Sequence, residues 1–334
     1  MAGKIFICCV FVYLFGSPKA TPVDFRKKLV IDHDGGADDA LAITISLLYE
    51  KYFCGPKVVA LTTTFGNVNL SQAIINSDRI LALGNRQDIP IYSGAERSLI
   101  SGILPDFFFG YDGLGDTGYS PPAPIELPEK PAAVALLELS RKFEGKLIIV
   151  AIGPLTNIAL AARIDPDFIG RLAHLYIGAG HIQSDEYPDP EFNAHMDPEA
   201  YYIVANSSLI DKVTFIPFSQ VYKTLSIPVD WRVNVLGEIR TPIMQALNDF
   251  ERISLPKSPY WSLLDPAVAA IALDNDLVDE FRNTSNGIIL EGSQRGINTN
   301  DFSSANPNTR VLYSANMEKY KKFLLDVYSA ELKP

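Results

Sequence analysis

The chain has 334 residues, of which 47% are hydrophobic, and its formal net charge at pH 7 is −10. This length suits one large α/β domain or two smaller ones with a sizeable core. A nucleic-acid partner is not expected, because phosphate contacts need clustered Lys and Arg and the sequence has no such block. A small or cationic ligand fits the acidic balance better.

Residues 1–20 have the features of a secretory signal. Lys4 supplies the charged start, and the apolar run Ile5–Phe15 is too short to span a bilayer. Small residues follow this run, so cleavage is expected near Ala20. The sequence therefore predicts a secreted, extracellular product with a single domain over residues 21–334 and without a membrane span.

Cysteine use and glycosylation motifs agree with export. Cys8 and Cys9 would leave with the signal, so Cys54 would stand alone and no disulfide within the chain is expected. We predict that Cys54 is a small buried side chain, since no His lies near it in the sequence. Three triplets fit the N-glycosylation pattern, beginning at Asn69, Asn206 and Asn283. Export makes a glycoprotein the expected product.

The stretch from Lys28 to Ala40 has the pattern of a strand, a sharp turn and the start of a helix. The apolar run Leu29–Ile31 predicts a buried parallel strand, and Gly35 and Gly36 allow the backbone to turn. Four carboxylates follow and would converge at the end of the strand: Asp32, Asp34, Asp38 and Asp39. Like charges this close raise one another's pKa unless a cation neutralises them, and calcium suits many flexible oxygen ligands.

Two other interpretations of this turn are open at this point. A lone Asp between a strand and a helix is more often a helix cap, although four acidic residues exceed what capping needs. The stretch Asp32–Gly36 also resembles the nucleophile loop of phosphatases of the haloacid dehalogenase type. That second interpretation gives no reason for Asp38 and Asp39.

Strands and helices alternate along most of the chain. Further strands are expected at residues 57–64, 89–92, 146–152, 172–177, 213–218, 287–290 and 310–313. Helices are expected at residues 41–49, 71–83, 132–143, 155–162, 199–205, 236–250, 267–273 and 317–330. The alternation from Lys28 to Leu273 predicts one doubly wound α/β domain, with an open, mostly parallel sheet and helices on both faces.

Polar residues follow several of these strands. Asn67 comes directly after the second strand, where a Gly-Asn pair is often only a turn. Ligands bind at the carboxyl edge of open parallel sheets, so Asn67 could face the same crevice as Asp34. Glu191 and Asn193 flank Phe192, and in an extended segment both side chains would point the same way.

Three other segments are informative. The turn Ile152–Asn157 lies at the same edge of the sheet, between a strand and a helix. Asp265 before Pro266 predicts a helix N-cap, which is by itself a sufficient structural explanation. The cluster Phe107–Phe109 fits no regular period, and we expect either a plug of the core or a lid over a flat ligand.

Together these motifs resemble those of the nucleoside hydrolases, the inosine-uridine-preferring nucleosidase family. The resemblance covers the chain from about Lys28 to its end. It is carried by the Asp turn, Gly66-Asn67, Ile152–Asn157, Glu191-Phe192-Asn193 and Asp265-Pro266. It implies a Rossmann-like nucleoside hydrolase fold and N-ribosyl hydrolase activity. The phosphatase interpretation predicts none of the later motifs and recedes.

The resemblance also implies a calcium ion. Its ligands would be Asp34, Asp39, Asp265 and the backbone carbonyl of Ile152, and Asp34 would be the general base that activates the attacking water. By the same transfer, four residues would hold the ribose: Asp38 and Asn193 at the 2′-hydroxyl, Glu191 at the 5′-hydroxyl, and Asn67 as support. Carboxylates around the sugar would stabilise its oxocarbenium-like charge.

The sequence departs from the family pattern at three places. Leu264 precedes Asp265 where inosine-uridine-type members carry the His that protonates the leaving base, and Phe109 stands where such members often have His. We therefore infer stacking of a purine on Trp261, Tyr260 or the Phe107–Phe109 cluster. The family's Asn for the 5′-hydroxyl is also missing, and three residues remain as alternatives: His181, Gln183 and Asp185.

The sequence hypothesis is a secreted, calcium-dependent nucleosidase with a purine preference. Small-molecule nucleosides are the expected partners, without nucleic acid or membrane, and formation of a homo-oligomer stays open. One alternative is a catalytically silent family member that binds or scavenges nucleosides. Another is an exported calcium-binding structural protein.

Overall fold

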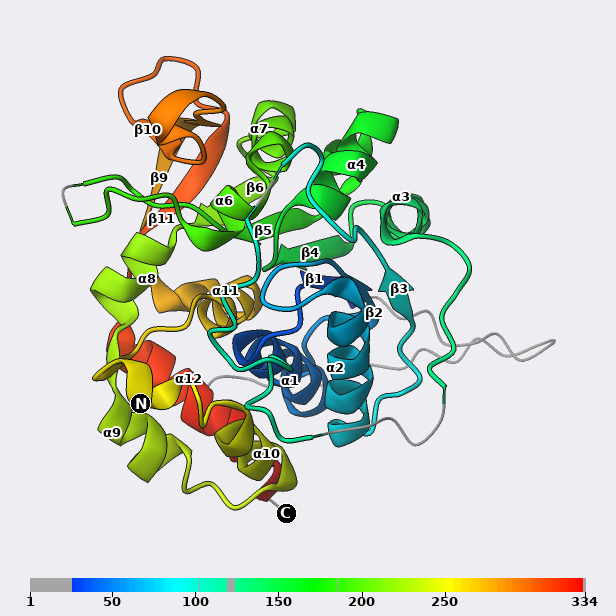
Figure 1. Cartoon of the computed structure of the whole chain (residues 1–334), viewed down its shortest axis with the longest axis vertical. Helices are drawn as coiled ribbons and strands as arrows, with labels where there is room; N and C mark the ends of the chain where they lie inside the picture. The colour runs from blue at the N-terminus through cyan, green and yellow to red at the C-terminus, as the bar shows by residue number, and fades with distance from the viewer. Residues whose placement is uncertain (1–25, 102, 119–123, 185, 333–334) are drawn as a thin grey trace, which may run out of the picture.

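The computed structural model describes residues 26–101, 103–118, 124–184 and 186–332 (Figure 1). The predicted signal over residues 1–20, with its cleavage near Ala20, lies outside the described residues. Within the described part of the chain, no helix is both long and apolar enough to cross a membrane.

One large sheet forms the centre of the molecule. In the described residues it has nine strands in the order β10-β9-β11-β6-β5-β4-β1-β2-β3. They are β1 (Lys28–His33), β2 (Lys57–Thr63), β3 (Ile91–Ser93), β4 (Leu147–Ala151), β5 (His174–Gly178), β6 (Val213–Ile216), β9 (Val278–Ile288), β10 (Asn298–Asp301) and β11 (Thr309–Ala315). Neighbouring strands from β3 to β11 run parallel, whereas β9 pairs antiparallel with β11 and β10. The predicted open, mostly parallel α/β sheet is confirmed.

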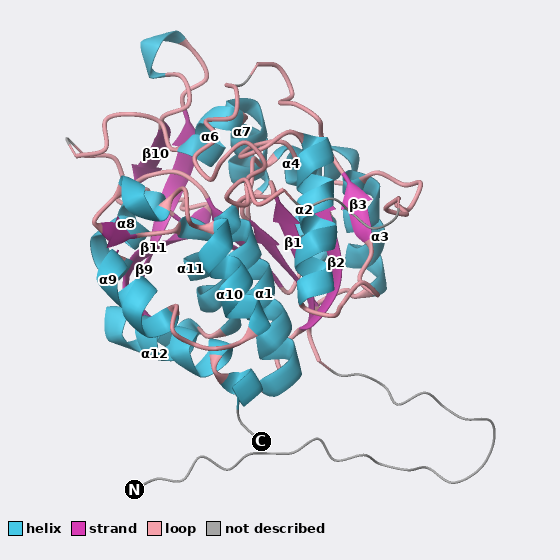
Figure 2. Cartoon of the chain, turned by 60° about the horizontal axis from the view of Figure 1, so that its bottom comes forward, coloured by secondary structure: helices cyan, strands magenta, loops and turns pink. Residues whose placement is uncertain are grey.

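Helices cover both faces of this sheet (Figures 1 and 2). One face is covered by α1 (Ala37–Tyr52), α2 (Leu70–Leu83), α8 (Phe218–Leu225), α10 (Pro242–Phe250), α11 (Leu264–Leu273) and α12 (Met317–Tyr328). The other is covered by α3 (Ala132–Lys142), α4 (Thr156–Ile164), α5 (Phe168–Arg171) and α7 (Pro198–Ser207). Each layer of helices has its own hydrophobic core against the sheet, as the prediction of helices on both faces requires.

β1 shows why the chain folds this way. Leu29 and Ile31 belong to the core beneath α1, while Val30 belongs to the core on the opposite face, and all three are fully buried. Successive side chains of a strand point to opposite faces, so a strand covered on both sides needs a continuous apolar run. The acidic turn therefore follows a strand that is held rigidly from both sides.

The order of the strands reverses next to β1. From β1 the chain adds β2 and β3 on one side, and β4, β5 and β6 on the other. In open α/β sheets, ligands bind outside the carboxyl ends of the strands at such a switch point. The turns that follow β1, β2 and β4 contain Asp34, Asn67 and Ile152, so the topology brings these residues to one crevice.

The predicted helix over residues 236–250 is wrong in its first half. A π-helical turn covers Arg232–Leu236, and α10 begins only at Pro242. Thr241 caps α10, since its hydroxyl oxygen accepts a hydrogen bond from the Met244 N–H at 3.2 Å. Proline lacks an N–H and is favoured in the first turn of a helix, which explains the break.

The antiparallel end of the sheet is larger than predicted. β9 is an eleven-residue strand that begins at Val278, whereas the sequence predicts a strand only over residues 287–290. β10 was not predicted at all, because Asn298–Asp301 consists of polar residues with weak strand preference. Pairing with β9, from Asn298 opposite Ile288 onward, supplies the order that its composition lacks.

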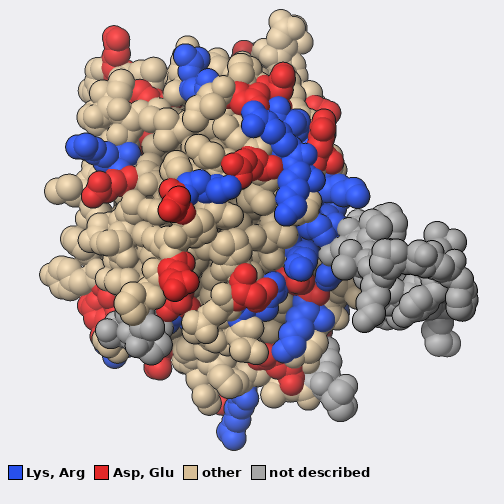
Figure 3. All heavy atoms as spheres, turned by 90° about the vertical axis from the view of Figure 1, so that its right-hand side faces the viewer, with Lys and Arg blue, Asp and Glu red and all other residues tan. Residues whose placement is uncertain are grey.

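Two predictions concern surface exposure, that of the Cys54 thiol and that of the glycosylation candidates. Cys54 is exposed, so the prediction of a buried thiol is wrong; it lies in the turn between α1 and β2 with φ of 56°. The glycosylation candidates Asn69, Asn206 and Asn283 are all exposed. Figure 3 shows acidic and basic side chains interspersed on one face, with Lys and Arg gathered along one edge.

Candidate active site

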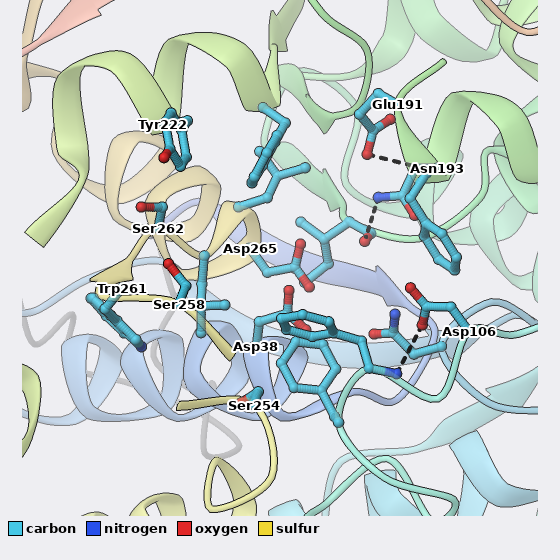
Figure 4. Close-up of a pocket in the computed structure, with 18 of the residues that line it drawn as sticks. Asp38, Asp106, Glu191, Asn193, Tyr222, Ser254, Ser258, Trp261, Ser262 and Asp265 are labelled. Atoms are coloured by element: carbon cyan, nitrogen blue, oxygen red, sulfur yellow. Dashed lines mark hydrogen bonds between the residues drawn. The ribbon is translucent and has the colours of Figure 1, made fainter. Parts of the chain in front are cut away.

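A pocket of about 440 Å³ lies at the carboxyl edge of the sheet (Figure 4), a size that suits a small molecule. Its lining includes every predicted site residue except Asp39, namely Asp34, Asp38, Asn67, Phe109, Ile152, Glu191, Asn193, Trp261 and Asp265. Asp39 is fully buried beside this group. The residues selected from the sequence therefore come together in space.

Asp39 closes the turn after β1. Its Oδ2 accepts a hydrogen bond from the Gly36 N–H at 2.5 Å, and its Oδ1 accepts one from the Asp34 N–H at 3.3 Å. Gly35 has φ of 84°, a conformation that favours glycine, and α1 begins directly afterwards at Ala37. Asp39 thus lies in the first turn of a helix, where the helix dipole favours negative charge.

The turn after β2 holds Asp34. The Asn67 N–H donates a hydrogen bond to Asp34 Oδ2 at 2.7 Å. A Cβ atom at Gly66 would overlap the same carboxylate, so only glycine lets the two turns approach this closely. The position of Asp34 therefore depends on the Gly66-Asn67 pair as well as on its own turn.

Asp32 does not line the pocket, and the expectation that all four carboxylates of the turn converge is wrong for this residue. Its Oδ1 accepts hydrogen bonds from the Thr62 hydroxyl at 2.5 Å and from the Asn157 amide at 2.8 Å. Complete burial raises the pKa of Asp32 to about 7, although these two bonds oppose the shift. Its contacts connect β1 to β2 and α4, which is a structural role.

Asp265 reaches the cluster from α11. This helix packs directly against α1, and both helices bury several alanines. One carboxylate oxygen from each of Asp38, Asp39 and Asp265 lies within 4.8 Å of the others. The predicted N-cap role of Asp265 is wrong, because Leu263 is the N-cap and Asp265 lies inside the first turn.

Burial is the main reason why the pKa values of these carboxyls are raised. The pKa of Asp39 rises to about 8, with repulsion from Asp38 as the second cause. Burial and then repulsion from neighbouring carboxylates also hold the pKa values of Asp34, Asp38 and Asp265 well above their usual range. A divalent cation would remove this repulsion, and donors that are all oxygen fit calcium or magnesium.

Ile152 contributes its backbone to the same region. The Asn193 side-chain amide donates hydrogen bonds to the carbonyl oxygens of Ile152 at 3.0 Å and of Gly178 at 2.9 Å. A carbonyl oxygen has two lone pairs, so Ile152 keeps one for a cation. The amide nitrogen of Asn193 is committed to the protein, and its oxygen is the atom left for a ligand.

Glu191 caps the short helix α6 (Phe192–Met196). Its carboxylate accepts hydrogen bonds from the N–H groups of Gly180 at 2.8 Å, Ala194 at 3.0 Å and Asn193 at 3.1 Å. The prediction of an extended segment here is wrong, because the helix begins directly after Glu191. Both Glu191 and Asn193 nevertheless line the pocket.

The pocket has an aromatic side that the sequence revealed only in part. Figure 4 shows Trp261 on one side of the acidic residues, with Glu191 and Asn193 on the other. Four hydroxyl side chains that were not predicted also line the pocket: Tyr222, Ser254, Ser258 and Ser262. They belong to segments of ordinary composition, so no motif marks them in the sequence.

The predicted aromatic cluster borders this side of the pocket. Phe109 is only 3% exposed yet lines the pocket together with Phe108, whereas Phe107 is 43% exposed. Lys257 Nζ donates a hydrogen bond to the Phe108 carbonyl at 2.6 Å and lies 4.5 Å from the centroid of its ring. The segment is therefore tied to the loop that follows α10, and Phe109 combines a packing role with a position on the pocket wall.

Histidine is scarce around this pocket. Leu264 lines it at the position before Asp265, and His181 is the one histidine of the described residues that does so. His181 is 7% exposed, and burial lowers its pKa to about 4, so that it is neutral near pH 7. Of the alternatives for the missing 5′-hydroxyl Asn, His181 lines the pocket, Gln183 does not, and Asp185 lies outside the described residues.

The fold and the pocket together define a class of protein. An open parallel α/β sheet has a small-molecule pocket at its switch point, and buried carboxylates there can share a divalent cation. The sequence over residues 29–322 matches the model of the inosine-uridine preferring nucleoside hydrolase family. The chain belongs to this family, whose members are metal-dependent N-ribosyl hydrolases.

Individual relatives agree with this assignment. The chain is 37% identical over 186 residues to a probable uridine nucleosidase 2 of Arabidopsis thaliana, which covers 54% of this chain and 56% of that protein. The chain thus spans about half the length of this relative. It is 28% identical over 310 residues to the inosine-uridine preferring nucleoside hydrolase of Leishmania major, covering 90% of this chain and 96% of that protein. The solved structure of a plant nucleoside hydrolase, the PpNRh1 enzyme, superposes with a TM-score of 0.81 at 26% identity, covering 91% of this chain and 99% of that one.

Proposed function

We propose that the chain is a calcium-dependent N-ribosyl hydrolase that cleaves ribonucleosides to free base and ribose. The observation that carries the proposal is the pocket, in which buried carboxylates lie between a polar side and an aromatic side. A ribose with its hydroxyl groups suits the polar side, and a flat base suits the aromatic side. The names of the relatives, which include uridine nucleosidases and inosine-uridine nucleoside hydrolases, support the same substrate class.

In this proposal Asp34 is the general base. One of its oxygens is fixed by the Asn67 N–H, and the other takes a proton from the attacking water. The water oxygen bonds to C1′ of the ribose, the C1′–N bond breaks, and the base leaves with the bonding electrons and takes a proton from solvent. Asp34, Asp39, Asp265 and the Ile152 carbonyl would hold the ion. When bound, calcium lowers the pKa of the attacking water and offsets the negative charge of the cluster.

The ribose is held by groups that the fold has already fixed. Asp38 and Asn193 are assigned to the 2′-hydroxyl, Glu191 to the 5′-hydroxyl, and Asn67 to support of the sugar. Asp38 also belongs to the group of carboxylates that could share a cation, so in this proposal it could contact the ion as well as the ribose. Such fixed contacts orient C1′ toward the water, and the carboxylates stabilise positive charge that develops on the sugar.

We also propose a preference for purine bases. Trp261 and Phe109 line the pocket. A histidine that could protonate the base is missing both at the position before Asp265, which is Leu264, and at position 109. Stacking on an aromatic side chain favours a base that is acquiring positive charge, and the larger purine ring gains more from it. Relatives named for uridine make pyrimidine nucleosides the necessary comparison.

Export and glycosylation complete the proposal. The signal-like residues 1–20 motivate a secreted product, and exposure of Asn69, Asn206 and Asn283 makes these positions accessible to glycosylation. Expression in a secretory host should give protein in the medium whose mass falls after treatment with an N-glycosidase. Retention of all protein inside the cells would contradict this part.

A panel of nucleosides tests the activity. Purified protein with calcium should release ribose from inosine, guanosine or adenosine, and Asp34→Asn should slow this release at least about a hundredfold. Trp261→Ala should impair purine nucleosides more than uridine. Absence of ribose release from every nucleoside would refute the proposed function, and an equal loss on purines and pyrimidines would make Trp261 merely structural.

The missing histidines favour a second candidate, a silent family member that binds nucleosides without hydrolysing them. Binding and turnover must therefore be measured on the same sample. A nucleoside at a hundredfold its dissociation constant raises the free energy of unfolding by roughly 2.7 kcal/mol, which is visible as a higher melting temperature. A shift without ribose release supports the silent binder, and the absence of both supports a calcium-binding structural protein.

A further inference from the structure

The wall behind Trp261 contains a buried ion pair that the proposed hydrolysis does not use. Arg232 and Glu251 are both 0% exposed, and the Arg232 Nε and Nη2 groups donate to Glu251 Oε2 at 2.8 and 2.5 Å. Arg232 Nη1 donates to Asn248 Oδ1 at 2.8 Å. Burying two charges costs free energy, and well-packed apolar residues often stabilise such a position as well or better. Stability alone therefore explains the pair poorly.

The second oxygen of Glu251 is bonded to Trp261. The indole Nε1–H donates to Glu251 Oε1 at 2.5 Å, and the guanidinium carbon of Arg232 lies 6.0 Å from the indole ring centroid. Trp261 is 3% exposed and lines the pocket. One edge of its ring is therefore anchored in the protein while part of the ring faces the space for a ligand.

The backbone of Glu251 organises the adjacent part of the same wall. Its carbonyl oxygen accepts hydrogen bonds from the N–H groups of Ser254 at 3.0 Å and Leu255 at 2.9 Å. Both of these residues line the pocket. Glu251 thus connects the buried arginine to three neighbouring residues of the pocket wall, although it does not line the pocket itself.

We propose that Glu251, held by Arg232, is a positioning residue that orients Trp261 as the surface on which the nucleoside base lies. The inference rests on the proposed function for the identity of the ligand. An aromatic contact depends on the mutual orientation of the rings, and a ring fixed in advance loses less conformational entropy on binding. Glu251 therefore acts on the choice between bases, since a purine covers more of the ring than a pyrimidine.

The two tryptophans of the chain permit a direct test. Trp231→Phe leaves Trp261 as the sole tryptophan, and Trp231 does not line the pocket. In this background, Glu251→Gln keeps an oxygen for the indole N–H but removes the charge that holds Arg232. The near-UV circular dichroism of Trp261 should weaken. The ratio of kcat/KM for inosine to that for uridine should fall about fivefold, as loss of an oriented aromatic contact predicts.

A second variant covers the case in which Glu251→Gln does not fold. Trp261→Phe retains an aromatic ring and the Arg232–Glu251 pair, but it removes the hydrogen bond that sets the orientation and part of the ring area. It should lower the inosine-to-uridine ratio by at least about twofold, because the smaller ring covers less of a purine and has lost its hydrogen bond to the Glu251 carboxylate. An unchanged inosine-to-uridine ratio in both variants, or an unchanged dichroism of Trp261 in Glu251→Gln, would overturn the inference.

A matched control is available in the Glu199–Arg295 pair, whose charged atoms lie 2.6 Å apart and which does not line the pocket. Glu199→Gln in the Trp231→Phe background should change neither the dichroism of Trp261 nor the substrate ratio. Failure of the proposed function can be distinguished from failure of this inference, because it would appear as an absence of ribose release by the unmodified protein. The dichroism experiment still tests the positioning of Trp261 in that event.

Discussion

The position of the Asp34 carboxylate depends on the absence of a side chain at Gly66. The Asp34 carboxylate occupies space that any side chain at position 66 would need, and the next N–H, that of Asn67, binds it. Two short turns on adjacent strands therefore act as one unit. The geometry around Asp34 can be tested from either side of this contact.

Substitution of the carboxylate itself gives the first prediction. Asp34→Asn keeps the size of the side chain and removes the proton acceptor, so kcat should fall roughly a hundredfold to ten-thousandfold, the range of general-base contributions. Steady-state ribose release measures this effect, with Asp301→Asn on the exposed end of β10 as the control. Turnover close to that of the unmodified protein would remove Asp34 from the role of base.

Substitution of the glycine gives the second prediction. The added methyl of Gly66→Ala must displace the Asp34 carboxylate, which should lower kcat strongly and reduce the free energy of unfolding by about 1–3 kcal/mol, as overpacking does. Gly170→Ala is a matched control, since a Cβ there meets only Leu209 Cδ1 at 3.8 Å. Urea unfolding and ribose release should separate the two variants, and equal behaviour would contradict the overlap.

At this scale the sequence predicted the polar residues of the pocket better than its hydroxyl and packing residues. Asp34, Asp38 and Asp39 stand out because acidic side chains rarely cluster beside a glycine pair. The role of Asp265 was misassigned, since an N-cap and a residue of the first turn look alike in a sequence. Ser258 and Ser262 carry no signal, because only the folding of distant segments brings them to the pocket.

At the scale of elements, β10 braces the loop that follows β5. Asn298 is 1% exposed, its Oδ1 accepts a hydrogen bond from the His181 N–H at 2.7 Å, and its amide donates to the His181 carbonyl at 2.9 Å. Gly180 next to it has φ of 83°, and its N–H binds Glu191. The antiparallel end of the sheet therefore holds the segment that carries the proposed 5′-hydroxyl ligand.

Removal of this brace is the third prediction. Asn298→Ala removes the partner of the buried His181 N–H, whereas the His181 carbonyl keeps a hydrogen bond from the Asn300 amide at 3.0 Å. The free energy of unfolding should fall by about 1–3 kcal/mol, and KM for nucleosides should rise more than kcat falls. Thr299→Ala, at the exposed neighbouring position of β10, is the control. Denaturant unfolding and initial rates check both effects, and an unchanged KM would show that the loop does not need the brace.

Element prediction failed where local preference and tertiary context disagree. The apolar spacing around Leu236 resembles that of a helix, yet Thr241 and Pro242 impose a new start and leave a π-helical turn before it. β10 has little strand preference and is ordered by pairing with β9. The strands β2, β4 and β5 were predicted to within two residues at each end, and the core of β1 was predicted over Leu29–Ile31, because a doubly covered strand needs an apolar run that no loop requires.

At the scale of the whole molecule, the acidic cluster joins two helices that lie far apart in the sequence. Asp39 comes from α1 and Asp265 from α11, and their burial makes the charged forms costly. For Asp39, the pKa is 3.8 without burial and about 8 in the folded chain. Without a cation, Asp39 therefore takes up a proton on folding at any pH between about 4 and 8. The corresponding contribution to stability is complete at acid pH and is lost as the pH rises through about 8.

The fourth prediction concerns removal of calcium and follows from this loss of stability as the pH rises. A chelator should lower the melting temperature more at pH 8 than at pH 6, because the ionised carboxylates repel one another most where protons no longer neutralise them. Calcium at a hundredfold its dissociation constant should restore roughly 2.7 kcal/mol. Calorimetry with and without chelator at both pH values measures the difference. Asp39→Asn should abolish most of it, and an equal effect of the chelator at both pH values would count against the cluster as the site of binding.

The topology of the chain could be predicted from the sequence more completely than the contacts between its helices and side chains. Alternation of strands and helices gives the doubly wound sheet, and the sheet places Asp34, Asn67 and Ile152 at one edge. Packing of α11 against α1 cannot be predicted from spacing alone, although it decides which carboxylates face each other. The ion pair of Arg232 and Glu251 likewise joins segments whose proximity no local pattern specifies.

The exposed thiol of Cys54 has a practical consequence. It lies before β2, at the amino end of the strands, whereas the pocket opens at their carboxyl ends, and it is the one cysteine of the described residues. A maleimide dye or a solid support attached there would lie at the opposite end of the strands from a bound ligand. Immobilised or labelled protein should therefore keep its ligand access, which offers a route to sensors built on this scaffold.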